Sequence, residues 1–92
     1  MAIKLAQVIL GAGATRVSAT SVPARQITIQ NNSGAAIRVG DSTVSATSGI
    51  LLSQGSPGGN AEFGSLVAYN VDLQDFWLFG TAASVIDVLW MT

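Results

Sequence analysis

The chain has 92 residues, of which 49% are hydrophobic and 10% are charged, and its net charge is −1. A chain this short buries only about two thirds of its unfolded surface, which fits a single domain spanning residues 1–92. Ordinary soluble domains carry about 25% charged residues, so much of this surface is expected to contact other proteins. Four scattered cations argue against a nucleic-acid-binding protein, and the absence of Cys and His excludes disulfides, the usual zinc sites and the commonest general base.

The first segment predicts a strand over Ile3–Leu10, because apolar residues occupy both sides of its alternation, as in a buried or interface strand. Residues 1–14 are a candidate N-terminal arm. The same stretch is similar to a weak secretory signal, but its loss would remove one strand from a small domain, so we expect it to be retained. After the glycines that follow it, Thr15–Ser18 predicts a short strand, and Pro23 marks a loop or a sheet edge.

The clearest local pattern is the alternation of apolar and polar residues over Gln26–Gln30, which resumes at Ile37–Val39. The connection at Asn31–Gly34 supplies the Asn and Gly residues that tight turns need for positive φ. The pattern therefore predicts an antiparallel hairpin made of these two strands.

Further along, Ile50–Leu52 is a short apolar run that predicts a buried strand. Residues 53–60 (SQGSPGGN) have the composition of an exposed, flexible loop. Leu66–Val71 predicts another strand, and Asp72–Asp75 suits a turn or one short helical turn.

The chain closes with a compact aromatic strand at Phe76–Phe79 and a strand at Val85–Met91 that is apolar on both faces. Trp90 shares one of these faces with Ile86 and Val88, so we expect it to pack in a core or a subunit contact. About six to eight short antiparallel strands without an amphipathic helix predict an all-β fold, as a small β-sandwich, a jelly-roll or a barrel.

Motifs that could carry chemistry fail on their context. Gly11–Arg16 (GAGATR) lacks the following helix that binds phosphate, and Gly40–Ser42 (GDS) lacks a histidine base, so both are interpreted as turns. Asp72 and Asp75, even with Glu62, provide too few ligands for calcium. The aromatic residues lie within apolar strands without a nearby cation in the sequence, which favours packing over ligand stacking. We therefore predict a protein that is not an enzyme, with no catalytic, cofactor or metal site.

Two blocks of sequence resemble short virion proteins of tailed bacteriophages. They are VGDSTVSATSGILLSQG at Val39–Gly55 and VDLQDFWLFGTAASVIDVLWM at Val71–Met91. In those proteins a G-D-S turn leads to a small apolar strand, and a D-L-x-D turn later precedes an aromatic strand, G-T and a closing strand. The resemblance implies a non-enzymatic particle component, assembled in the host cytoplasm and located in the virion, and it carries over no functional residue.

The leading hypothesis is a capsid decoration, or cement, protein that binds and stabilises the phage head. A head-to-tail connector or tail component is the alternative of the same class, and a receptor- or carbohydrate-binding β-module is the alternative of another class. The expected partners are further copies of the chain, with a trimer as one candidate form, and the major capsid protein or other virion proteins; nucleic acid and membrane are not expected. The predicted interface residues are the apolar residues of the first and last strands: Ile3, Leu5, Ile9, Leu89 and Met91.

Overall fold

The computed structural model describes residues 2–53 and 64–92, and within them it contains eight β-strands and one short 3-10 helix. The flexible-loop prediction falls, apart from Ser53, outside the described residues. The strands and the 3-10 helix (η1) are, in chain order, β1 (Ile3–Ile9), β2 (Thr15–Arg16), β3 (Pro23–Asn31), β4 (Ile37–Gly40), β5 (Ile50–Leu52), β6 (Ser65–Asp72), η1 (Leu73–Asp75), β7 (Trp77–Phe79) and β8 (Val85–Met91).

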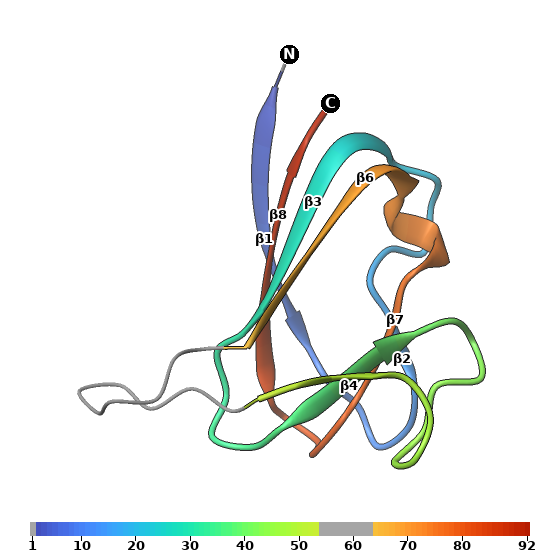
Figure 1. Cartoon of the computed structure of the whole chain (residues 1–92), viewed down its shortest axis with the longest axis vertical. Coiled ribbons are helices and arrows are strands. Elements are labelled where there is room, and N and C mark those ends of the chain that lie inside the picture. Colours follow the sequence, from blue (N-terminus) through green and yellow to red (C-terminus); the bar gives the residue numbers. More distant parts are fainter. Residues whose placement is uncertain (1, 54–63) are drawn as a thin grey trace.

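The strands form two four-stranded antiparallel sheets (Figure 1). Sheet A has the order β1-β8-β3-β6, and sheet B has the order β2-β7-β4-β5. The predicted all-β class is thus confirmed. Of the three architectures left open by the sequence, the barrel does not fit, because the sheets do not close, whereas the two sheets form a small β-sandwich whose nested pairs (β1 with β8, β2 with β7, β3 with β6, β4 with β5) follow the jelly-roll order. No helix in the described parts of the chain has the length and apolar character needed to cross a membrane.

The core lies between the two sheets. Sheet A contributes Ile27 and Ile29 from β3 and Ile86 and Val88 from β8, all with no exposed surface, and sheet B contributes residues such as Leu78. The spacing of two between these residues is the period of a strand, so each strand turns alternate side chains into the core. Trp90, next on the same side of β8, packs against this cluster, as its spacing predicted.

The predicted hairpin is wrong. β3 pairs with β6 and β8 in sheet A, whereas β4 pairs with β5 and β7 in sheet B, so residues 32–36 cross from one sheet to the other. The apolar sides of β3 and β4 face each other across the core, where Ile37 is 1% exposed and Val39 is 3% exposed. Two packed sheets need such facing apolar sides, and this interaction outweighs the local turn signal.

Asn31 holds the point where the chain leaves sheet A. Its side chain is fully buried, and its amide nitrogen donates hydrogen bonds to the carbonyl oxygens of Ala35 (2.8 Å), Leu52 (3.2 Å) and Ser53 (3.1 Å). Its amide oxygen accepts from the backbone N–H of Ser33 at 3.0 Å and from the Ser33 hydroxyl. Because Leu52 belongs to β5, this one side chain ties the end of β3 to sheet B, and it supplies a donor to the buried Leu52 carbonyl.

Two burial predictions need correction. Ile50 and Leu51 are 58% and 55% exposed, because β5 is an edge strand of sheet B and only Leu52 turns into the core. β1 is also an edge strand, and six of its seven residues are exposed, so it is not a buried strand. The interface alternative for β1 therefore remains a prediction.

We expect Asn31→Ala to lower the free energy of unfolding by about 3 kcal/mol, because the buried Leu52 carbonyl and the part-buried carbonyls of Ala35 and Ser53 lose their donor at once. Urea unfolding followed by tryptophan fluorescence measures the change. Asn32→Ala is the matched control, since Asn32 is the exposed neighbour and its replacement should change stability by less than about 0.5 kcal/mol. Equal effects of the two substitutions would contradict the role assigned to Asn31.

Candidate assembly surface

The outer face of sheet A, which points away from sheet B, carries most of the exposed large apolar residues of the described chain. Register partners in antiparallel strands point to the same side of a sheet, so alternate residues of β1 form rows with their partners across β8, β3 and β6. The fourteen positions of these rows, called the outer face below, are Ile3, Met91, Gln26 and Tyr69; Leu5, Leu89, Thr28 and Val67; Gln7, Asp87, Gln30 and Ser65; and Ile9 with Val85.

Six of the eight large apolar residues that are exposed in the described chain lie on this face. In β1, Ile3, Leu5 and Ile9 are 67%, 69% and 65% exposed, and at the opposite edge Tyr69 is 66% exposed. Scattered exposed apolar residues are normal on a soluble protein, but six of them gathered on one face, from β1, β8 and β6, are typical of a contact surface. The β3 positions between them, Gln26, Thr28 and Gln30, are polar.

Asp87 is the one charged residue among the fourteen outer-face positions. The Gln7 amide nitrogen donates a hydrogen bond to its carboxylate across β1 and β8 at 3.2 Å. Together with Gln30 and Ser65 these residues form a polar row that runs across the sheet between apolar rows. A partner on this face would therefore meet apolar area and amide groups, and ion pairs would contribute little to its binding.

The middle of the outer face is slightly hollowed. The hollow has a volume of about 370 Å³, and it lies where the polar row meets the next apolar row. Its lining residues are Leu5, Gln7, Thr28, Gln30, Asp87 and Leu89. A protruding side chain of a partner would find apolar walls and hydrogen-bonding amides here, the combination found at the centre of protein interfaces.

The structure brings the five predicted interface residues together on this one face. Ile3 pairs with Met91, Leu5 pairs with Leu89, and Ile9 lies in the last row. Sequence reasoning missed Val67 and Tyr69, which extend the face to β6. Both sides of β6 are apolar in sequence, so alternation alone could not tell which side turns outward.

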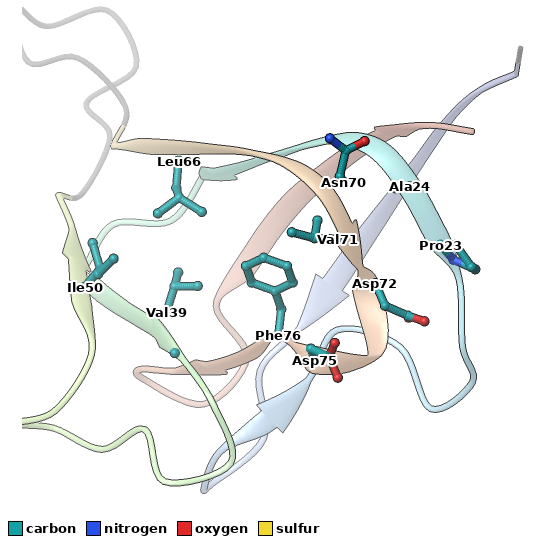
Figure 2. Close-up of a pocket in the computed structure, with 11 residues that line it drawn as sticks. Pro23, Ala24, Val39, Ile50, Leu66, Asn70, Val71, Asp72, Asp75 and Phe76 are labelled. Atoms are coloured by element: carbon teal, nitrogen blue, oxygen red, sulfur yellow. The ribbon is translucent and has the colours of Figure 1, made fainter.

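A second concave feature, shown in Figure 2, is an open groove between the two sheets with a volume of about 770 Å³. Leu66 and Val71 of β6 lie on one side, and Val39 and Ile50 of sheet B lie on the other, while the acidic residues lie near η1. The full lining consists of Pro23, Ala24, Val39, Gly40, Ile50, Leu66, Asn70, Val71, Asp72, Asp75 and Phe76. Its walls can hold an apolar group.

Asp72 in this groove has a structural task. Its carboxylate accepts hydrogen bonds from the Ser21 hydroxyl and from the backbone N–H groups of Val22 (2.8 Å) and Gln74 (2.9 Å), and the last of these caps η1. These bonds, the Ser21 hydroxyl first, hold the pKa of Asp72 below its ordinary value of 3.8. A carboxylate that accepts three hydrogen bonds in this way is a poor general base. The 3-10 helix that it caps confirms the predicted turn at Asp72–Asp75.

The carboxylate of the GDS motif also has a structural role. In the GDS turn the Asp41 carboxylate accepts from the backbone N–H of Thr43 at 2.8 Å and from its hydroxyl, which lowers the pKa of Asp41. The described residues contain no group of three or more acidic side chains that could hold a metal ion, and Glu62, considered above with Asp72 and Asp75, lies outside them.

One aromatic residue does meet a cation, contrary to the sequence-based expectation. The Arg16 guanidinium lies over the Trp77 ring, 5.3 Å from its centroid, because β2 pairs with β7 and places these two residues opposite each other. Arg16 Nε also donates to the carbonyl oxygen of Gln74 at 2.7 Å. The cation therefore anchors the short strand β2. The sequence could not show this contact, because the two paired residues lie about sixty positions apart in the chain.

Comparisons with known protein families, with curated proteins and with solved structures found no match for the chain. The geometry of the outer face and the resemblance of the two sequence blocks are therefore the observations that bear on function.

The bonds of Asp72 predict a specific pH dependence. Because its pKa is lowered by folding, its contribution to stability is fully present above about pH 4 and is lost as the pH falls through the folded-state pKa. We expect Asp72→Asn to lower the melting temperature at pH 7 and to make its fall between pH 5 and pH 2 shallower than in the parent. Ser21→Ala keeps the carboxylate and removes one donor, so the slope of its melting temperature against pH should lie between that of the parent and that of Asp72→Asn. Parallel curves for all three proteins would refute the assignment.

Proposed function

We propose that this protein is a non-enzymatic structural subunit of a tailed-phage particle that binds through the outer face of sheet A. The observation that carries the proposal is the combination on that face of exposed apolar side chains from β1, β8 and β6 with a single charged residue. The resemblance of the blocks at residues 39–55 and 71–91 to phage virion proteins supplies the class of particle. Within this class we propose a decoration protein of the head, whose partners are further copies of the chain and the major capsid protein.

The size of the apolar surface supports binding to another protein. The six exposed apolar side chains present on the order of 600 Å², at the upper end of the largest apolar patch found on typical monomers. At about 25 cal/mol per Å², covering most of this area favours association by roughly 10 kcal/mol before the entropy of association is subtracted. After that cost of about 4 kcal/mol or more is subtracted, a single site on this face binds weakly, and a shell that offers many equivalent sites to an oligomer strengthens the binding.

Support for a decoration protein over a carbohydrate- or receptor-binding module comes from the position of the aromatic side chains. Sugar-binding sites usually present exposed aromatic rings within a concave site. In the groove between the sheets the single aromatic residue, Phe76, is partly buried against the core, whereas the exposed Tyr69 lies on the outer face. The same outer face would serve a connector or tail component, so the position within the particle is what the experiment has to separate.

We expect Leu89→Lys to weaken binding to shells stripped of this protein by at least tenfold, since it introduces a charge near the centre of the apolar face, a change worth about 2 kcal/mol or more. Leu51→Lys is the matched control, because Leu51 is an exposed leucine on sheet B, and its effect should stay within about twofold. Cosedimentation with stripped heads, and separately with isolated tails, measures binding.

Salt provides a second readout of the same binding. The outer face has one charged residue, so the affinity for heads should change by less than about threefold between low and high ionic strength. Loss of binding with Leu51→Lys but not with Leu89→Lys would overturn the proposed surface, and binding to tails in place of heads would overturn the decoration assignment.

A further inference from the structure

β1 forms one edge of sheet A, and the hydrogen-bonding groups along its free side can be identified. Ala2 accepts from the N–H of Thr92, and Leu10 both donates to Ser84 and accepts from Ala83. Bonded and non-bonded pairs alternate along an antiparallel ladder, so the even-numbered residues of this segment bond toward β8. The odd-numbered residues, from Ile3 to Ile9, therefore present their N–H and C=O groups to the free edge.

This edge lacks the features that normally protect a strand from pairing with another chain. β1 has seven residues, no proline and one charge, Lys4, near its start. The other edge of sheet A differs, because Asn70 adopts a left-handed conformation (φ 55°) within β6, which then leads into η1. Such a kink interrupts regular pairing, so β1 is the edge of sheet A that is open to a regular partner strand.

We infer that β1 pairs with β1 of a second copy in an antiparallel, two-fold symmetric ladder centred on Ala6. This inference rests on the proposed function, which already includes further copies of the chain as partners, and it states how one such copy joins sheet A. In this register Ile3 faces Ile9 of the second copy and Leu5 faces Gln7, so the free-edge groups of all four odd-numbered residues find partners. Lys4 faces Val8, and the lysines of the two copies therefore do not oppose each other.

The symmetry of this pairing has two consequences. Paired residues point to the same side of a sheet, so the two outer faces join into one continuous eight-stranded surface that carries the exposed apolar residues of both copies. The ladder alone buries less than the roughly 800 Å² per partner of a standard interface, so the dimer in solution should depend on concentration. On a shell, the joined face would contact the particle over twice the area.

Cysteine cross-linking tests the register, because the chain has no cysteine of its own. Ala6 is exposed and would face Ala6 of the second copy with Cα atoms about 4.5 Å apart, within disulfide range. The two Lys4 residues would lie about 14 Å apart, beyond that range. Under mild oxidation we expect a covalent dimer from Ala6→Cys and none above background from Lys4→Cys. Equal cross-linking of the two variants, or none by Ala6→Cys, would overturn the register.

A proline at position 7 tests the free edge itself. Gln7→Pro removes an N–H that points away from β8, so the fold of the subunit is kept while the second copy loses a donor and meets the ring. Gln7→Ala is the matched control, since it removes the same side chain, including its bond to Asp87, and keeps the N–H. Sedimentation velocity should show self-association at least tenfold weaker for Gln7→Pro than for Gln7→Ala, with both folded by circular dichroism. Equal association of the two variants, or a trimer that survives Gln7→Pro, would refute the inference.

Binding to heads separates this inference from the proposed function. Val67→Lys alters the outer face at β6, far from the β1 edge in the sheet order, so it should impair head binding and leave self-association unchanged. If the edge variants associate like the parent while Val67→Lys loses head binding, the edge inference fails and the proposed function stands. If Val67→Lys binds heads like the parent while the edge variants lose self-association, the proposed surface fails and the edge pairing stands.

Discussion

The contact between the two sheets is the interaction on which the rest of the structure depends. Four residues without exposed surface, Ile27 and Ile29 of β3 with Ile86 and Val88 of β8, form the sheet A side of that contact. Because side chains alternate along a strand, burying these residues forces their neighbours to the opposite side of sheet A. The outer face is therefore a direct consequence of the core: Leu89 is exposed because Val88 is buried.

The outer face is unusually apolar because the chain has few charged residues. In an ordinary antiparallel sandwich the outward positions of a strand are polar and often charged, which keeps the surface soluble. Here the outward positions of β1 and β8 are mostly apolar, and Asp87 is the one charged residue on the outer face. A small domain has little core in which to bury the surplus, and this is why we propose that a partner covers it. Two of the few other charged residues do not protect this face, because the carboxylates of Asp41 and Asp72 bond to a turn and to the start of η1.

The sequence was most informative where structure is local. Alternation located the last strand at Val85–Met91 with the bounds that the structure shows, and turn chemistry located the short helical turn within Asp72–Asp75. It failed where the answer depended on residues distant in the chain. The segments 26–30 and 37–39 were correctly predicted as strands but were assigned to one hairpin, because nothing local reveals that Asn31 bonds to Leu52 and turns the chain into the other sheet. The candidate site was predicted at its β1 and β8 part, and its β6 part was missed because both sides of that strand are apolar.

If the protein binds a phage head as proposed, the outer face of sheet A is covered in the particle. Hydroxyl-radical footprinting with mass spectrometry measures this directly, by comparing the oxidation of each side chain in dilute free protein and in intact particles. We expect Leu5, Tyr69 and Leu89 to become strongly protected in the particle. Leu51, which is exposed on sheet B, should be oxidised to the same extent in the free protein and in the particle. Unchanged oxidation of the three outer-face residues, together with protection of Leu51, would contradict the proposed coverage.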